Sequence, residues 1–124
     1  MQTDTFKDKV VIVTGGANGI GRCIADEFRK QGAIVYVVDK QEGEHFVGDI
    51  SKQDVLEAFA SEVLSKHNKV DIIVNNALPL MRGIDECSYD EFQYALSVGV
   101  TAPFYLVKLL KNHLAEGASI INIS

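Results

Sequence analysis

The sequence predicts an α/β domain built on a doubly wound parallel sheet of about five strands, in the order 3-2-1-4-5. Short β-branched runs alternate with longer segments that repeat apolar residues at helical spacing. This alternation is typical of βαβ units. A glycine-rich segment also separates the first apolar run from the first helical pattern. Together these observations predict helices on both faces of the sheet and a ligand site at the carboxyl ends of its strands.

The five predicted strands share apolar, largely β-branched composition. The first shows no polar alternation, which is typical of a strand that is covered on both faces. Only the link Lys40–His45 separates the second and third, so we expect a turn or loop there, because a full crossover helix needs about ten residues or more. The predicted strands are Val10–Val13, Ala33–Val38, Phe46–Val47, Val70–Val74 and Ser119–Ser124.

Three helices are predicted between these strands. The first, Ile20–Gln31, carries an apolar stripe and ends at Gly32, a typical helix stop. The second runs from Ser51, a credible N-cap, to Lys66. Their expected core-facing residues are Ile24, Ala25 and Phe28 in the first, and Val55, Phe59, Val63 and Leu64 in the second.

The third predicted helix is long and begins after Ser88, which can cap it. Its later part, Ala102–Leu114, is strongly apolar, and Gly117 is expected to end it. Its apolar residues include Phe104, Leu106, Val107 and Leu110.

Composition and charge restrict the classes of partner. The chain has 124 residues, of which 47% are hydrophobic and 23% charged, and this balance fits one globular domain. A net charge of -5 offers no extended basic surface for nucleic acid or an anionic membrane. The first nine residues lack a secretory signal pattern, and no apolar run approaches the roughly 20 residues of a membrane span. We therefore expect a cytoplasmic protein without a nucleic-acid or membrane partner.

Cysteine and histidine usage does not indicate a metal site. Cys23 and Cys87 lie far apart without a second ligand pair, so we expect free thiols. His45, His67 and His113 are isolated, and we interpret them as surface or helix-end residues. The acidic residues at the start of the third helix are interpreted as structural, because the helix dipole favours negative charge there; they are Asp85, Glu86, Asp90 and Glu91.

The segment Thr14–Gly21 predicts a dinucleotide site because it lies between a strand and a helix. Gly15 allows a tight turn, Gly19 lets the backbone approach a pyrophosphate, and Gly21 permits close helix-to-strand packing. The helix N-terminus adds free N–H groups and a positive dipole. A tight turn that binds nothing is the alternative.

Asp39 favours NAD over NADP. It ends the second strand 18 residues after Gly21, near the offset at which a carboxylate meets the adenosine ribose hydroxyls. That carboxylate would repel a 2′-phosphate, and Asn18 supplies no positive charge to welcome one. Lys40 argues in the opposite direction, and a solvated strand-end carboxylate is the alternative reading of Asp39.

Three motifs in this order resemble the short-chain dehydrogenase/reductase family: Thr14-Gly-x-x-x-Gly-x-Gly21, Gly48-Asp-Ile50 and Val74-Asn-Asn-Ala77, with Ile120-Ile-Asn-Ile-Ser124 at the fifth strand. The resemblance implies a Rossmann-like fold and an NAD-dependent oxidoreductase acting on an alcohol or carbonyl substrate. It implies cofactor contacts by the loop residues, including Asn18 and Ile20, and by Asp39. It further implies that Asp49 binds the adenine amine, that Ile50 contacts the base, and that Asn76 and Ala77 lie near the adenosine ribose.

Structural roles are alternatives for some of these residues. Asp49 precedes a helix and is also placed to cap it. The side chains of Asn75 and Asn76 are placed to tie strand ends together, a role that can coexist with cofactor binding.

Two positions depart from the family pattern. Leu78 stands where Gly usually follows Asn-Asn-Ala, so the loop near the nicotinamide is expected to take a different path. Gly99 stands where the resemblance places the Asn of the catalytic tetrad. Because Gly costs roughly 1 kcal/mol relative to Ala inside a helix, we expect a packing or water-mediated reason for it.

By the resemblance, the catalytic Ser and the Tyr-x-x-x-Lys pair would follow Ser124. We therefore expect residues 1–124 to form a cofactor-binding domain that is incomplete at its carboxyl end and inactive by itself. The alternatives are a non-catalytic dinucleotide-binding or interaction module and an inactive remnant. The tyrosines present lie in a predicted strand or on helical patterns and are interpreted as packing residues; they are Tyr36, Tyr89, Tyr94 and Tyr105.

Two apolar regions are expected to seek partners. The loop Leu78–Met81 either faces substrate or packs within the fold. The fifth strand is expected at the edge of the sheet, with Ile120, Ile121 and Ile123 uncovered. Together with the apolar helix Ala102–Leu114, this edge predicts self-association or marginal stability, and the native form is expected to be a homo-oligomer.

Overall fold

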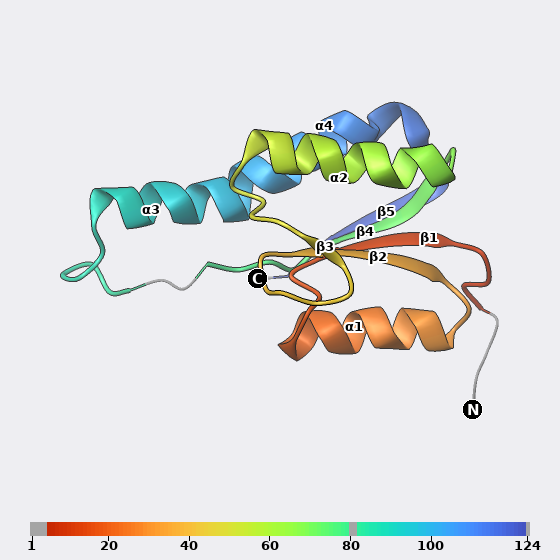
Figure 1. The fold of residues 1–124 in the computed structure, drawn as a ribbon, viewed down its shortest axis with the longest axis horizontal. Helices are drawn as coiled ribbons and strands as arrows, with labels where there is room; N and C mark the ends of the chain where they lie inside the picture. Colours follow the sequence, from red (N-terminus) through yellow and green to blue (C-terminus); the bar gives the residue numbers. More distant parts are fainter. Residues whose placement is uncertain (1–4, 80–81, 124) are drawn as a thin grey trace.

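The computed structural model describes residues 5–79 and 82–123, which contain a five-stranded parallel sheet. Its order is β3-β2-β1-β4-β5, as the sequence predicts. Each strand pairs in parallel with its neighbour (Figure 1). The strands are β1 (Val10–Thr14), β2 (Ile34–Asp39), β3 (Phe46–Val47), β4 (Val70–Asn75) and β5 (Leu114–Asn122). Ser124, the last predicted residue of the fifth strand, lies outside the described residues.

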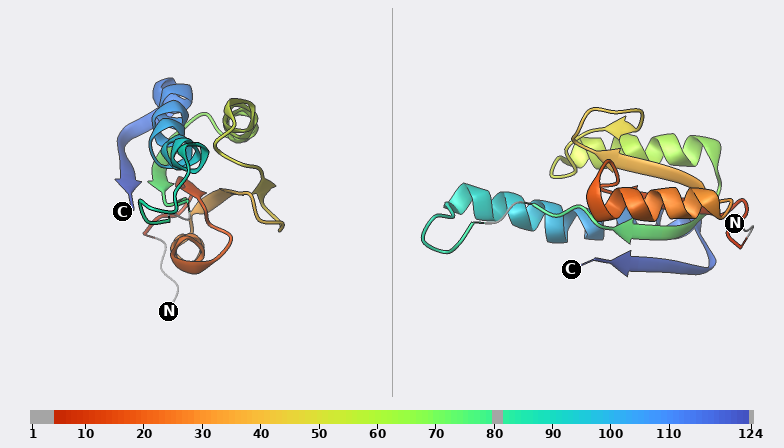
Figure 2. Two further views of the ribbon diagram at one scale, coloured as in Figure 1. Left: turned by 90° about the vertical axis from the view of Figure 1, so that its left-hand side faces the viewer. Right: turned by 90° about the horizontal axis from the view of Figure 1, so that it is seen from below.

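Helices cover the sheet on both faces. Helices α2 (Gln53–Lys66) and α4 (Ala102–Leu110) lie on one face, and α1 (Gly19–Lys30) lies on the other (Figures 1 and 2). Alternate residues of β1 therefore enter different cores. Ile12 packs with Phe59 of α2 and Leu106 of α4, whereas Val11 and Val13 pack beside Ala25 of α1. This two-sided burial explains why the first strand shows no polar alternation.

The long third helix is present but contains a wider turn. Ser88 caps α3 (Tyr89–Leu96), because its Oγ accepts a hydrogen bond of 3.1 Å from the backbone N–H of Glu91. A π-helical turn, η1 (Ser97–Thr101), then joins α3 to α4. Helix α3 extends beyond the sheet (Figures 1 and 2), and none of its residues is fully buried.

An apolar strip runs along the outer side of this long helix. Its members follow one another at intervals of three or four residues, the spacing that places side chains on one helical face. The strip consists of Tyr89, Phe92, Leu96, Val100 and Phe104, which are all exposed. The apolar residues of α4 differ in exposure, since the side chain of Phe104 is 64% exposed, whereas Leu106 and Leu110 are fully buried.

The predicted N-cap at Ser51 is wrong. Helix α2 begins at Gln53, and its capping position is Lys52, which makes no side-chain cap. The backbone N–H of Ser51 instead donates to Asp49 Oδ1 at 2.9 Å. This local turn before the helix displaces the helix start by one residue, and it also means that Asp49 does not cap α2.

The predicted helix end at Gly117 is also wrong. Helix α4 ends at Leu110, a short 3₁₀ turn (Lys111–His113) follows, and β5 begins at Leu114. Leu114 pairs with Val70, but the next pair along β4 joins Ile72 to Ser119. Gly117 lies in this irregular segment with a φ of +78°, so its left-handed conformation serves a distortion within the strand.

Two further expectations are confirmed. Residues 40–45 form a loop between β2 and β3, and β5 lies at the edge of the described sheet with Ile120 43% and Ile121 40% exposed. The expectation that Ile123 is also uncovered is wrong, because its side chain is partly buried and packs against the core on the α1 side of the sheet. Within the described ranges, no helix is long and apolar enough to span a bilayer.

Candidate functional site

A pocket of about 760 Å³ opens where β1, β2, β3 and β4 end. Residues from the loops that follow all four strands line it, so the parallel topology gathers segments that are distant in sequence. Of the predicted cofactor residues, all but Gly21 line this pocket: Gly15, Asn18, Gly19, Ile20, Asp39, Asp49, Ile50, Asn76 and Ala77.

The glycine-rich loop forms one wall of the pocket. Gly15 and Gly19 have φ values of +68° and +58°, a region that glycine adopts without the usual steric penalty. A Cβ at Gly19 would meet no atom within 4 Å, so space remains above the loop. A Cβ at Gly21 would overlap the carbonyl oxygen of Gly15 and the amide of Asn76. Gly21 therefore sits behind the wall, where it allows α1 to pack against the loop.

Helix α1 begins at this wall with its first N–H groups unblocked. Asn18 occupies the N-cap position but makes no side-chain cap, and the first turn contains no acidic residue. Its side-chain amide instead donates to Gln41 Oε1 at 2.8 Å. The helix N-terminus therefore offers backbone donors and a positive dipole, a combination that suits a phosphate oxygen.

Asp39 joins the end of β2 to the glycine-rich loop. Its Oδ2 accepts a hydrogen bond of 3.0 Å from the backbone N–H of Ala17, and its Oδ1 accepts one of 2.9 Å from Gln41 N–H. Asp39 is thus held by backbone donors at the mouth of the pocket, which is a more specific position than that of a freely solvated carboxylate.

Asp49 is the second carboxylate of the pocket. Its Oδ1 accepts hydrogen bonds from Ser51 N–H at 2.9 Å and from the Tyr94 hydroxyl at 3.1 Å. Burial raises the pKa of Asp49, but these hydrogen bonds and the positive charge of Lys40 outweigh that effect and hold the pKa below its ordinary value. Asp49 is therefore an ionised hydrogen-bond acceptor near neutral pH. The adjacent Ile50 is buried and adds an apolar contact surface.

The end of β4 is tied to the end of β1 by a hydroxyl that the sequence reasoning missed. Thr14 Oγ1 accepts hydrogen bonds of 3.1 Å from the backbone N–H groups of both Asn76 and Ala77. The Asn76 side chain donates to the Gly15 carbonyl at 3.0 Å. A polar residue at the end of an otherwise apolar strand was the available signal for Thr14.

The two asparagines after β4 have different surroundings. Asn75 is buried, and its Nδ2 donates to Asn122 Oδ1 at 2.9 Å, which ties β4 to β5. Asn76 ties β4 to the glycine-rich loop and also lines the pocket. The tying role considered for both residues is therefore observed.

Tyr94 is the main functional candidate that the sequence reasoning missed. Its interpretation as a packing residue is incomplete, because Tyr94 lines the pocket and hydrogen-bonds Asp49. Lys40 Nζ lies 5.6 Å from the centroid of its ring. Burial and the negative charge of Asp49 raise the pKa of the Tyr94 hydroxyl, so it remains a protonated donor. Val98, one turn further along the helix, joins it in the lining.

The two departures from the family pattern lie in different places. Leu78 lines the pocket and is 63% exposed, whereas Gly99 lies in the π-helical turn. A Cβ at Gly99 would meet no atom within 4 Å, so the packing reason expected for this glycine is wrong. Leu80 and Met81 lie outside the described residues, which leaves the substrate-facing role of their loop as a prediction.

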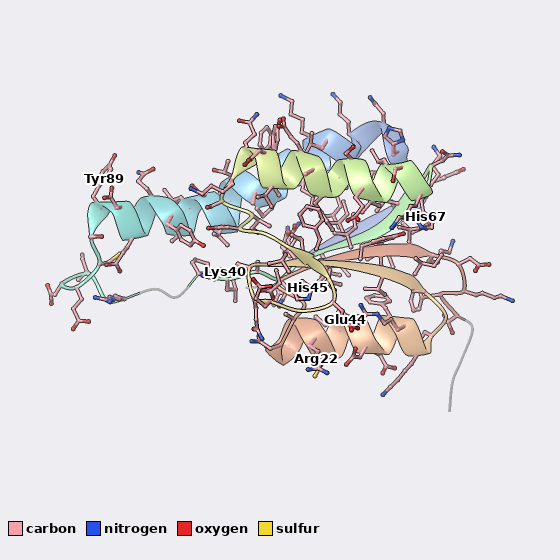
Figure 3. All side chains as sticks on the ribbon, in the orientation of Figure 1. Arg22, Lys40, Glu44, His45, His67 and Tyr89 are labelled. Carbon is pink, nitrogen blue, oxygen red and sulfur yellow. The ribbon has the colours of Figure 1, made fainter. Side chains whose placement is uncertain are left out.

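The other tyrosines and the histidines make contacts away from the pocket. Tyr36 precedes Lys40 by four residues, which is the spacing of a Tyr-x-x-x-Lys pair. The two side chains do not act together, however, because the Tyr36 hydroxyl lies 2.7 Å from His67 Nε2. Figure 3 shows Lys40 and His67 at opposite ends of the sheet. Tyr105 donates to Glu57 at 2.6 Å, between α4 and α2. Tyr89 lies on the outer end of α3 (Figure 3). The remaining histidines contact backbone carbonyls: His45 that of Gln41 and His113 that of Asn68.

The described residues contain no group of three His, Cys, Asp or Glu side chains that could hold a metal ion. Cys23 and Cys87 are both free thiols, as expected.

Taken together, the residues that line the pocket present backbone N–H donors, two carboxylates and apolar surface. These groups fit a nicotinamide dinucleotide, whose pyrophosphate requires the donors and whose sugar and base require the carboxylates.

Comparison with known proteins gives consistent matches. A family model described as short chain dehydrogenase matches residues 9–124. L-fucose dehydrogenase of Mus musculus is 36% identical over 96% of this chain and 49% of its own length. The 3beta-hydroxysteroid dehydrogenase of Mediterraneibacter gnavus is 28% identical over 96% of this chain and 50% of its own length. The chain thus spans about half the length of these curated relatives.

A solved structure also matches the fold closely. The 3-ketoacyl-(acyl-carrier-protein) reductase of Brucella melitensis, complexed with NADH, superimposes with a TM-score of 0.86 at 28% identity. The match covers 97% of this chain and 58% of that reductase.

Proposed function

Since the chain belongs to the short-chain dehydrogenase family, we propose that it binds NAD in the pocket described above, as the cofactor-binding part of an oxidoreductase. The observation that carries this proposal is the convergence of the α1 N-terminus, Asp39 and Asp49 on one pocket. The similarity to two dehydrogenases and a reductase supports hydride transfer between a small alcohol or carbonyl substrate and nicotinamide.

Each part of the pocket suits one part of NAD. The N–H groups at the start of α1 suit the pyrophosphate, and Asp39 suits the adenosine ribose hydroxyls. Asp49 suits the adenine amine, and Ile50 offers an apolar contact to the base. Asn76 and Ala77 suit the ribose. When bound, the nicotinamide would supply the hydride acceptor or donor, while these residues hold and orient the nucleotide.

NAD is proposed over NADP because the Asp39 carboxylate lies in the lining of the pocket. A 2′-phosphate beside this carboxylate would meet like-charge repulsion. Lys40 does not cancel this effect, because its ammonium group is directed toward the Tyr94 ring. The cytoplasmic location expected from the sequence stays a prediction.

A calorimetric titration of the full chain with NADH and NADPH tests the proposal. We expect NADH to bind at least about tenfold more tightly than NADPH, and Asp39→Asn to reduce this preference. Asp85→Asn is the matched control, since Asp85 is exposed and lies outside the pocket lining. A folded chain that binds neither nucleotide would refute the proposal and favour the inactive remnant.

A second candidate is a dinucleotide-binding module without turnover. Gly99 favours it, because the family resemblance places the proton-relay Asn at that position. The two candidates share NADH binding and differ in hydride transfer. Because residues 1–124 are proposed to be inactive by themselves, the assay uses a protein that also carries the Ser and Tyr-x-x-x-Lys segment implied by the resemblance. Oxidation of bound NADH by a panel of carbonyl compounds would then support the enzyme, and tight binding without oxidation would support the module.

The partner proposed for this chain is a second copy of itself. The apolar strip on α3 and α4 and the exposed Ile120 and Ile121 on the edge strand present hydrophobic surface on connected elements. Burial of such surface favours association.

A further inference from the structure

Tyr94 connects the projecting helix α3 to the interior of the pocket. Its hydroxyl reaches Asp49 Oδ1 at 3.1 Å, although 45 residues separate the two in sequence. Lys40 Nζ lies 5.6 Å from the centroid of the Tyr94 ring, so a carboxylate and an ammonium group both lie beside Tyr94. This arrangement gives α3, which has no fully buried residue, a polar contact with the body of the fold.

The contact also restricts the orientation of the Asp49 carboxylate. Ser51 N–H and the Tyr94 hydroxyl both donate to Oδ1, and the Ser51 side chain also hydrogen-bonds the carboxylate. Donors from two separate segments therefore fix the rotation of a carboxylate that lines the pocket. An ionised carboxylate has about four acceptor positions, so these donors leave acceptor capacity for a ligand.

An ionised carboxylate accepts hydrogen bonds but cannot donate them. It therefore favours a base that presents an exocyclic amine over one that presents a keto oxygen at the same position. Adenine presents the amine, whereas hypoxanthine presents the keto oxygen and is otherwise closely similar. The orientation of Asp49 is thus a potential source of selectivity between these bases.

We propose that Tyr94 is a positioning residue for base recognition, which holds the Asp49 carboxylate in the orientation that accepts a hydrogen bond from the adenine amine. This inference rests on the proposed function, because it assumes that NAD occupies the pocket. Tyr94 acts through Asp49, so its removal should change selectivity for the base more than it changes the fold.

The test compares binding of NADH with binding of reduced nicotinamide hypoxanthine dinucleotide. We expect the wild-type chain to prefer NADH and Tyr94→Phe to reduce the preference about fivefold, since one hydrogen bond to a charged group is lost. Tyr105→Phe is the matched control, because Tyr105 also donates to a carboxylate, Glu57, but lies outside the pocket lining. It should leave the preference unchanged, and circular dichroism should show that both variants are folded.

A double-mutant cycle with Asp49→Asn establishes whether Tyr94 acts through Asp49. In the Asp49→Asn background, Tyr94→Phe should produce no further change in the preference. An equal change in both backgrounds, or an unchanged preference in the single variant, would overturn this inference while leaving NAD binding intact. Failure of the wild-type chain to bind NADH would overturn the proposed function and this inference together.

Discussion

The pocket end of this molecule and the arm formed by α3, η1 and α4, of which α3 projects beyond the sheet, are held together in different ways. At the pocket end, short hydrogen bonds connect the loops after the strands, as with Thr14 to Ala77 and Asp39 to Ala17. Along the arm, the described outer face is apolar and exposed, and α3 has no fully buried residue. The pocket end is already complementary to a polar ligand. The arm presents an apolar surface that only an apolar partner would cover.

The two regions also differ in how closely their atoms are packed, as two glycines show. An added Cβ at Gly21 would overlap the loop backbone, whereas one at Gly99 would meet nothing within 4 Å. The same substitution should therefore have opposite effects in the two regions, which makes alanine a probe of how closely each region is packed.

The largest effect is expected from Gly21→Ala. The new methyl group must displace the Gly15 carbonyl or the Asn76 amide, and such overpacking costs about 1–3 kcal/mol of unfolding free energy. Because the displaced loop forms a wall of the pocket, NADH affinity should fall by more than about tenfold. Urea unfolding and calorimetric titration measure the two effects, and wild-type values for both would show that the loop is loosely packed.

The apolar strip should produce the next largest effect. We expect sedimentation velocity to show concentration-dependent self-association of the full chain. Phe104→Lys should weaken it by about tenfold or more, because a large side chain is no longer buried. Asn112→Lys adds the same charge at an exposed position outside the strip and should leave association unchanged. A chain that stays monomeric over a wide concentration range would contradict the proposed homo-oligomer.

The pocket end was largely predictable from sequence, and the arm was not. The spacing from Gly15 to Asp39 and the motifs around Asp49 and Asn76 are local, so they mark the loops directly, and parallel topology then brings those loops together. The role of Tyr94 depends on the angle at which α3 leaves the sheet, which no local pattern encodes. Helical periodicity therefore placed Tyr94 on a helix but gave it only a packing role.

The same reasoning explains the errors at element boundaries. Serine is a residue type that often caps helices, but the N–H of Ser51 donates a hydrogen bond to Asp49, and α2 starts one residue later than predicted. Glycine is a residue type that often ends helices, but the chain has already left the helix before Gly117, because Leu114 pairs with Val70 and begins β5. A local turn determined the first boundary, whereas pairing between strands that are distant in sequence determined the second.

Gly99→Ala should have a smaller effect, of opposite sign to that of Gly21→Ala. Gly99 is exposed, and its backbone lies within a continuous helix without a positive φ. Replacement by Ala should stabilise the chain by about 0.5–1 kcal/mol, because the unfolded chain loses conformational freedom. Thermal and urea unfolding measure this change. A destabilised variant would indicate that the π-helical turn requires glycine for a reason other than space.

The smallest effect is the pH dependence that arises from Asp49. Its pKa in the folded chain lies below the ordinary carboxyl value of about 3.9, so its ionised form contributes stability above that pH, and the contribution is lost as pH falls through the folded-state pKa. The charged and titratable groups that act on its pKa are Lys40 and Tyr94, and both lower it. Because Asp49 is only partly buried, the contribution should stay below about 1 kcal/mol.

Urea unfolding between about pH 6 and pH 3, on either side of the ordinary carboxyl pKa, isolates this contribution. The wild-type chain should exceed Asp49→Asn in stability at the upper end, and the difference should shrink toward the lower end as the wild-type carboxylate is protonated. Asp85→Asn should follow the wild type throughout, since Asp85 is exposed and has no part in the pocket. A stability difference that grows on acidification would mean that Asp49 is held protonated. The Asp49 carboxylate could then not have the proposed role of accepting a hydrogen bond from the adenine amine.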